Sequence, residues 1–380
     1  MTRPLGLVLL ATLATSTRAT WPRLDEALKN YPSIHARETA RLKAGQPAKF
    51  VLVVCYHGLG NRHHALVSAF ALALARDAAL YVDWPDQRCN KWAQAGDAAA
   101  CEASGLEDLF ARPPFDWTAL ASGHKDKGSR LRGRVRGEKK YAWAGWRLSH
   151  GSEWQVQEAD LEEGPWNASV VVRTDHHFLH GVLCNAQIKS KKLFPPDDAL
   201  AVQRILEAYL LKPSKSITKA VDEALGDSGC GVGLHLRRAD EHAEWNPRET
   251  WERIAPLLSK TEGGLFVASD GYSAPFRAAL ERAAKAAGAV VVPSPSTPTP
   301  SMLALAENHV LARCKHLVPT NASTFFNIAA VRAMGHSRAV RDVYTCPPVF
   351  VYRADAVLGT TSTHVGRLKF DSTQVPARGA

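Results

Sequence analysis

The sequence predicts an α/β protein with two lobes, each built on a parallel sheet flanked by helices. Its length of 380 residues is greater than that of an ordinary domain with one hydrophobic core and fits two domains of about 150 to 200 residues each. Apolar residues make up 46% and charged residues 22%, which is the composition of a folded soluble protein. In both halves, short β-branched runs alternate with segments of helical periodicity, as expected for parallel sheets.

The first lobe, expected over residues 48–195, opens with a β-α-β unit. The run KFVLVVCY at 49–56 predicts a buried strand. A turn containing Gly58 and Gly60 follows, where glycine would permit positive φ, and apolar residues then recur at helical spacing through Leu74. The other strands expected in this lobe lie at 79–84, 141–148 and 170–173.

The second lobe, expected over residues 196–340, begins with a helix that Asp197 or Asp198 caps and that runs through Leu211. Further strands are predicted at 230–236, 264–269, 289–292 and 316–318. Further helices are predicted at 248–258, 274–287, 302–313 and 323–334. Ligands of such sheets bind at the carboxyl ends of the strands, so polar residues there are site candidates.

The first 19 residues have the parts of a secretory signal peptide: one Arg, an apolar run over 5–13 and a small-residue pattern that ends at Ala19. The run is about half of the ~20 residues that a membrane-spanning helix needs, which favours a cleaved signal over an anchor. We therefore expect the mature protein in the ER or Golgi lumen without a stable membrane span. Residues 341–380 are expected to pack back as a tail or to be partly disordered.

The formal charge of +10 is concentrated in one segment. A basic insertion near 123–140 contains eight Lys or Arg and two acidic residues, and so supplies +6 of this charge. This distribution does not indicate a nucleic-acid partner. A solvated loop is the favoured interpretation, and contact with an acidic polysaccharide is the alternative.

Seven cysteines suit an oxidising compartment and leave at least one unpaired. Cys89 and Cys101 flank a short polar loop and are the best candidates for a bridge. Cys55, Cys230 and Cys314 lie in or beside apolar runs and are expected to be small buried hydrophobes. No CxxC or CxxxH spacing indicates a zinc site, and no metal is expected.

The segment from Gly58 to His63 follows a strand, opens a helix and precedes Asp83 at the end of the next strand. This arrangement imitates a dinucleotide fingerprint, but His63 stands where the third glycine belongs, so an NAD-dependent oxidoreductase is only a minor alternative. The turn does not explain the polar cluster that follows it, which consists of Asn61, Arg62, His63 and His64.

The segment GVGLHLRRAD at 231–240 carries the sharpest signal in the chain. On a strand, His235 and Arg237 point to the same side. The guanidinium groups of Arg237 and Arg238 form a forked donor array that suits a diphosphate. For Arg238 the alternative is a surface ion pair with Asp240.

Two other strand ends carry polar groups. Asp270 follows the strand at 264–269, where its carboxylate could accept hydrogen bonds from a nucleotide base. The segment LVPTNASTF at 317–325 ends in hydroxyl groups at a helix start, where free N–H groups and the helix dipole favour phosphate. Ser323 could also serve as an ordinary helix cap.

These segments resemble the fucosyltransferase superfamily, which includes α1,2, α1,6, plant xyloglucan and protein O-fucosyl enzymes. The resemblance rests, in order and spacing, on GLGNR, SAFALAL, LYVDW, GVGLHLRRAD, FVASD and LARCKHLVPTNASTFFNIAAVRAMG. It covers about residues 50–84 and 190–336. The middle of the chain and its tail are not matched, and no single branch of the superfamily fits throughout.

The resemblance implies a GT-B-like fold of two Rossmann-like lobes, with GDP-fucose in the second lobe and a glycan or glycoprotein acceptor between the lobes. It implies that Arg237 contacts the β-phosphate and that Asn61 and Arg62 face the reacting sugar. His235 and Asp270 would contact guanine or ribose. All candidates for donor binding are His235, Arg238, Asp240, Asp270, Ser323, Thr324 and Phe325.

The expected reaction is an inverting transfer, in which negative charge grows on the β-phosphate as GDP departs. Arg237 and helix N–H groups could stabilise that charge without a metal ion or other cofactor, and the sequence contains no DxD motif. The sequence offers four candidates for the general base and does not decide between them: His57, His63, His64 and Asp83. A catalytically silent glycan- or nucleotide-binding protein on the same fold is the second hypothesis.

Overall fold

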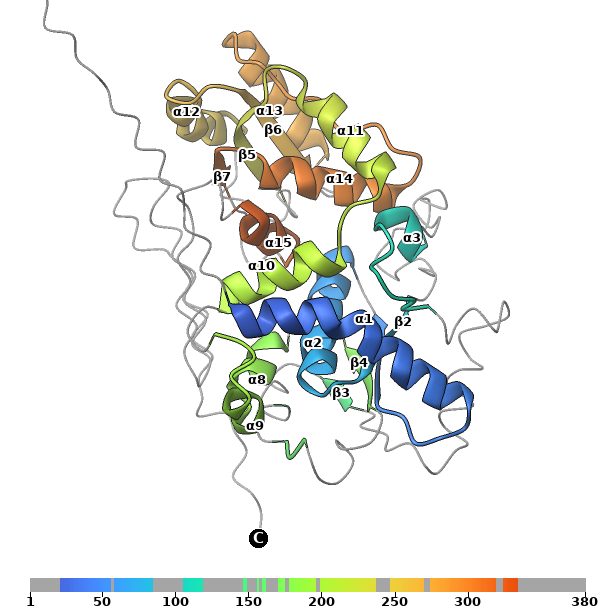
Figure 1. The fold of residues 1–380 in the computed structure, drawn as a ribbon. Helices are drawn as coiled ribbons and strands as arrows, with labels where there is room; N and C mark the ends of the chain where they lie inside the picture. Colours follow the sequence, from blue (N-terminus) through green and yellow to red (C-terminus); the bar gives the residue numbers. More distant parts are fainter. Residues whose placement is uncertain are drawn as a thin grey trace, which may run out of the picture.

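In a computed structural model, the chain forms two parallel sheets surrounded by helices (Figure 1). The structure describes residues 21–55, 58–84, 105–118, 146–148, 156, 159–161, 170–174, 178–195, 199–236, 247–269, 274–318 and 324–333. The predicted signal peptide, basic insertion, tail and Cys89–Cys101 bridge lie outside these residues.

The sheet of the first lobe contains four parallel strands in the order β2-β1-β4-β3. They are β1 (Phe50–Cys55), β2 (Ala79–Asp83), β3 (Trp146–Leu148) and β4 (Val170–Thr174). Every residue of β1 is buried, because strands flank it on both sides and helices cover the sheet. The predicted strands at 49–56, 79–84 and 170–173 are confirmed. Of the strand predicted at 141–148, only 146–148 falls within the described residues.

Among the described residues, five helices belong to this lobe. They are α1 (Pro22–Lys43), α2 (Leu59–Ala75), α3 (Leu106–Leu109), α8 (Leu179–Cys184) and α9 (Ala186–Ser190). The predicted helix α2 is buried along nearly its whole length, because its many alanines allow the sheet and several helices to approach it closely.

The sequence analysis does not predict α1, which contains Pro32 in its interior. A proline has no N–H to donate to the carbonyl four residues earlier, which here is that of Leu28. The hydroxyl of Tyr209 donates to this carbonyl across 3.0 Å. A tertiary hydrogen bond thus replaces the missing helical one, and α1 continues past the proline.

The second lobe contains three parallel strands in the order β6-β5-β7. They are β5 (Cys230–Leu236), β6 (Gly264–Ser269) and β7 (His316–Val318). The helices are α10 (Ala199–Leu210), α11 (Lys215–Leu225), α12 (Pro247–Leu258), α13 (Ala274–Ala286), α14 (Pro300–Ala312) and α15 (Thr324–Ala333). The predicted elements are confirmed to within two residues at their described ends, with one exception.

The exception is the strand predicted at 289–292. Val291 makes only an isolated bridge to Leu265. Two backbone hydrogen bonds of 2.8 Å join Leu265 to Val290 and Val292. Pro293 and Pro295 then follow, and proline cannot donate to a sheet ladder, so the pairing does not extend into a strand.

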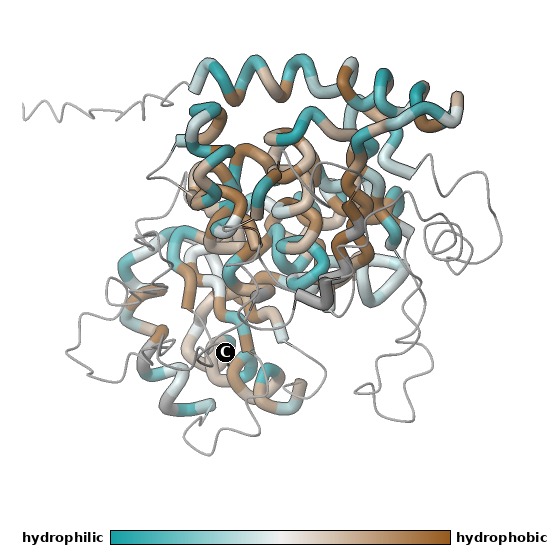
Figure 2. The backbone as a smooth tube through the Cα atoms, turned by 90° about the horizontal axis from the view of Figure 1, so that it is seen from below, coloured by the Kyte–Doolittle hydropathy of each residue, from teal (hydrophilic) through white to brown (hydrophobic). Residues whose placement is uncertain are grey.

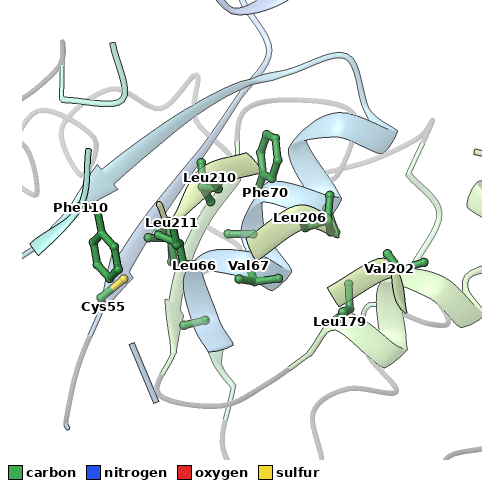
Figure 3. Close-up of a cluster of buried hydrophobic side chains, with 14 of the residues drawn as sticks. Cys55, Leu66, Val67, Phe70, Phe110, Leu179, Val202, Leu206, Leu210 and Leu211 are labelled. Atoms are coloured by element: carbon green, nitrogen blue, oxygen red, sulfur yellow. The ribbon is translucent and has the colours of Figure 1, made fainter. Parts of the chain in front are cut away.

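The helices α10 and α15 lie between the two sheets (Figure 1). Figure 3 shows Val202, Leu206 and Leu210 of α10 in the same cluster as Leu66 and Phe70 of α2. Figure 2 shows the apolar positions gathered in the interior and polar ones along the outer helices. One hydrophobic cluster therefore joins both lobes, and a second cluster lies within the second lobe, among β5, β6, α12 and α13. Within the described ranges, no helix has the length and apolar character that crossing a bilayer requires.

Cys230 and Cys314 form a disulfide, so the expectation that both are merely small buried hydrophobes is wrong. The start of β5 lies beside the turn after α14, which brings the two Cα atoms within 4.5 Å. Cys184 also takes part in a disulfide. Cys55 is a free and buried thiol, as predicted.

Candidate functional site

The first feature of the candidate site is the turn between β1 and α2. Gly58 is the N-cap of α2 in an extended conformation with φ of −64°, and Gly60 is already helical. The expectation of positive φ at these glycines is therefore wrong. A Cβ at Gly58 would meet nothing within 4 Å, so neither strain nor crowding requires glycine there.

Just after this turn, Arg62 is 4% exposed, whereas Asn61 is partly exposed. The guanidinium carbon of Arg62 lies 4.9 Å from the centroid of the Trp84 ring, a cation–π contact. Trp84 follows β2 directly, so this contact joins the start of α2 to the carboxyl end of the sheet.

Three of the four candidate bases lie within the described residues, and His57 lies outside them. Asp83 is partly exposed at the end of β2, opposite Val54 of β1. The pKa of Cys55 is raised to about 12, mainly by burial; the charge of Arg62 lowers it and the charge of Asp83 contributes to the increase. His64 is 6% exposed and His63 is 1% exposed.

His63 belongs to a buried polar network between the lobes. Its Nε2 lies 3.3 Å from Oε1 of Glu207 on α10. The other carboxylate oxygen of Glu207 lies 3.6 Å from Nε of Arg332 on α15. The amide of Gln203 donates to Glu207 Oε1 across 2.8 Å. Three helices thus meet at one carboxylate that is 3% exposed.

The charges of this network follow from its burial. Burial by itself would raise the pKa of Glu207, but His63, Arg332 and Gln203 together hold that pKa well below its usual value. Burial lowers the pKa of His63, and Arg332 lowers it further against the pull of Glu207. His63 is therefore neutral at neutral pH. With its proton on Nε2, His63 faces the carboxylate of Glu207 on one side, and on the other its Nδ1 faces Nη2 of Arg332 at 3.5 Å.

Asn308 of α14 extends the network toward the second sheet. Nη1 of Arg332 donates to Oδ1 of Asn308 across 2.7 Å. Nδ2 of Asn308 donates to the carbonyl of Phe325 across 2.6 Å. The first and last turns of α15 are thus both hydrogen-bonded to the side-chain amide of Asn308.

The structure brings together two of the predicted donor-binding residues. His235 is the penultimate residue of β5, and Phe325 lies in the first turn of α15. Their rings stack with centroids 5.1 Å apart at an angle of 29°. His235 is 5% exposed and Phe325 is partly exposed. The end of a buried strand and the start of a helix therefore converge, as the sequence analysis predicts.

A second ion pair lies on the helices that follow β6. Glu307 of α14 accepts a hydrogen bond of 3.0 Å from Nη1 of Arg277 on α13. Arg277 also pairs with Glu281 and with the hydroxyl of Ser294. Burial raises the pKa of Glu307 to about 7, although Arg277 and Ser294 lower it.

Several predicted site residues lie outside the described residues. They are His57, Arg237, Arg238, Asp240, Asp270 and Ser323, and of Thr324 only the backbone is described. The sequence analysis misses Glu207, Asn308 and Arg332. A signal for Glu207 was present, because it lies on the helix face that carries Leu206 and Leu210, where a polar residue is expected to be buried with a partner. Among the described residues, no group of three His, Cys, Asp or Glu could hold a metal ion.

The fold matches that of one solved fucosyltransferase, and other solved fucosyltransferases are more distantly similar. A variant of FUT1 from Arabidopsis thaliana in complex with GDP is 20% identical, covers 82% of this chain and 78% of its own, and gives a TM-score of 0.53. Fucosyltransferase NodZ from Bradyrhizobium is 14% identical over 74% of this chain and 93% of its own, with a TM-score of 0.42. POFUT1 in complex with GDP is 16% identical over 76% of this chain and 96% of its own, with a TM-score of 0.39. No protein-family model and no curated protein sequence matches the chain.

The likeness to FUT1 covers 82% of this chain. It confirms the predicted α/β fold of two lobes with parallel sheets, the GT-B arrangement. The buried network and the stacked rings link the start of α2, the start of α15 and the end of β5, and these three places make up the candidate site.

Proposed function

We propose that this protein is an inverting, metal-independent glycosyltransferase that transfers L-fucose from GDP-fucose to a hydroxyl group of a glycan or glycoprotein. The observation that carries the proposal is its fold, which it shares over 82% of its length with a fucosyltransferase bound to GDP. The stacked pair of His235 and Phe325 at the carboxyl end of the second sheet supports it, because ligands of such sheets bind at that edge.

In the proposed reaction, the oxygen of the acceptor hydroxyl attacks the anomeric carbon of fucose from the face opposite GDP. The bond from that carbon to the β-phosphate oxygen breaks, and GDP leaves with the bonding electron pair. A base takes the hydroxyl proton. Arg237 would stabilise the charge that develops on the β-phosphate, with the N–H groups at the start of α15.

The described geometry bears on the choice of base. Both ring nitrogens of His63 face groups of the buried network, which favours a positioning role for this residue. Asp83 is partly exposed at the carboxyl end of β2, and this exposure favours it over His63 as the base that takes the acceptor proton. His57 and His64 remain candidates on sequence.

The donor is tested by a thermal-shift panel of sugar nucleotides with the full-length protein. We expect GDP and GDP-fucose to raise the Tm and UDP-sugars to leave it unchanged. A shift by UDP-sugars alone would overturn the donor assignment. Binding of GDP without transfer to any acceptor or to water would favour the catalytically silent alternative.

The leaving-group role is tested by replacing Arg237. Arg237→Ala should lower kcat by about 10² to 10³, the effect of removing one preorganised donor to a developing oxyanion. Arg237→Lys should rescue little, because an ammonium group lacks the planar fork of the guanidinium. A folded Arg237→Ala variant with more than about a tenth of the wild-type kcat would refute this role.

We also propose that the protein resides in the lumen of the ER or Golgi, delivered by the signal peptide at residues 1–19. The Cys230–Cys314 bridge supports this, because structural disulfides persist mainly in oxidising compartments. Peptide mapping of the secreted protein should find a glycan on the sequon at Asn167 and none at Asn321, which lies in the proposed donor loop. An unglycosylated protein isolated from the cytosol would contradict the assignment.

A further inference from the structure

The buried network between the lobes connects the two halves of the candidate site. On the first-lobe side it ends at His63, which directly follows Asn61 and Arg62. On the second-lobe side it ends at the carbonyl of Phe325, whose ring stacks on His235. A continuous series of contacts therefore runs from the start of α2 to the end of β5.

The network is built from one buried carboxylate and one permanent cation. Glu207 is 3% exposed, and the side chain of Arg332 is 12% exposed. Four elements supply the titratable groups that face each other here: His63 from α2, Glu207 from α10, His309 from α14 and Arg332 from α15. Burial lowers the pKa of His309, and Arg332, His63 and Arg313 lower it further, so this side chain adds no second cation at neutral pH.

Stability alone does not account for such a pair. The cost of removing two charges from water offsets their attraction, so replacing a buried pair by apolar residues is often neutral or stabilising. A buried pair does impose a specific geometry, because each partner must keep its position to avoid leaving the other uncompensated. Arg332 satisfies this constraint with three partners at once, through Nε, Nη1 and Nη2.

We propose that Glu207 and Arg332 are positioning residues that hold the start of α2 at a set distance from the start of α15. The inference rests on the proposed function, in which the first of these helix starts faces the reacting sugar and the second faces the diphosphate. Loss of the pair should then impair the transfer step more than donor binding, because the donor site lies within the second lobe. Misplacement of reacting groups by about 1 Å can cost about 100-fold in rate.

The decisive variant is the double replacement Glu207→Leu/Arg332→Met. It removes both charges together and so avoids the uncompensated charge that a single replacement leaves. We expect it to stay folded and to bind GDP within about threefold of wild type, while kcat falls at least about tenfold, or about 1.4 kcal/mol. If kcat stays within about threefold of wild type in the folded variant, the pair is only structural and the proposal fails.

Arg332→Lys provides a second test that keeps the charge in place. An ammonium group cannot reach Glu207, Asn308 and His63 in the planar geometry of the guanidinium. We therefore expect kcat to fall while Tm and GDP affinity change little. Full activity of this variant would show that charge alone is sufficient and would overturn the geometric role.

Glu38→Gln is the matched control. Glu38 on α1 is a buried carboxylate that pairs with Arg37 and accepts from the backbone N–H of Lys49 across 2.9 Å. All these partners belong to the first lobe, so this variant should lower Tm without a selective loss of kcat. If Glu38→Gln and Glu207→Leu/Arg332→Met lose the same fraction of kcat for the same decrease in Tm, the effect on kcat is one of stability and the proposal is refuted.

Hydrogen exchange separates failure of this inference from failure of the proposed function. If wild type neither binds GDP nor transfers fucose, the proposed function fails. The coupling itself is then read from amide exchange at residues 58–64 and 324–327 of wild type and the double variant. Faster exchange in both segments of the variant supports the coupling, and unchanged exchange in either segment overturns it.

Discussion

Removal of the bridge between Cys230 and Cys314 should be the most destabilising conservative change in the second lobe. The two cysteines are 84 positions apart. In the chain-entropy account, closing a loop of that size stabilises the folded state by about 4.5 kcal/mol. The bridge joins the start of β5 to the turn after α14, so its loss frees the central strand of the sheet from the helix that covers it.

The variant Cys230→Ala/Cys314→Ala keeps the fold's apolar contacts apart from the two sulfur atoms. Domains of about 150 to 250 residues lose about 2 to 4 °C of Tm per kcal/mol, so we expect a decrease of about 10 °C or more. Two assays are made on wild type and variant without reducing agent. The first is guanidinium unfolding monitored by tryptophan fluorescence, and the second is a thermal melt.

Cys55→Ala is the matched control, because Cys55 is a buried free thiol in the other lobe. It removes one sulfur atom without opening a bridge and should cost about 1 kcal/mol, as an ordinary point substitution does. If the double alanine variant loses no more than twice the loss of Cys55→Ala, the bridge contributes nothing beyond packing and the reasoning is refuted.

Three further predictions concern packing, pH and metal. Gly233→Ala should lower the free energy of unfolding by about 1 to 3 kcal/mol through overpacking, because the added Cβ would lie 2.7 Å from Sγ of Cys314. Gly58→Ala should leave Tm nearly unchanged, because a Cβ there would meet nothing within 4 Å. Equal Tm values for the two variants would contradict this. The folded pKa of Glu307, about 7, lies above the ordinary 4.5, so its contribution to stability is complete below that ordinary value and is lost as pH rises through about 7. Relative to wild type, Glu307→Gln should therefore gain about 1.4 kcal/mol of unfolding free energy between about pH 6 and pH 8 in denaturant titrations, and a pH-independent difference would disprove the assignment. Fucose transfer should persist in excess EDTA, and complete loss of turnover that Mg²⁺ or Mn²⁺ restores would defeat the metal-free mechanism.

The local elements that build the site could be predicted from the sequence. The run at 230–236 is continuous and apolar, and all seven residues of β5 are buried, because a central parallel strand is covered on both faces. The convergence of His235 and Phe325 also follows from sequence order, since a strand end and the helix start after a neighbouring strand meet at one sheet edge. Periodicity predicts each strand and each helix because a residue and the neighbours that set its pattern lie in one segment, and the convergence then follows from the general rule for parallel sheets.

Other features depend on residues that are far apart in the chain. Arg332 and His63 are 269 positions apart, and the hydroxyl of Tyr209 reaches the Leu28 carbonyl from 181 positions away. Apolar periodicity shows which face of a helix is buried but not which helix covers it or at what rotation. Those relations are set by packing of the whole core, so the interlobe network and the helix that continues past Pro32 were decided only by the tertiary structure.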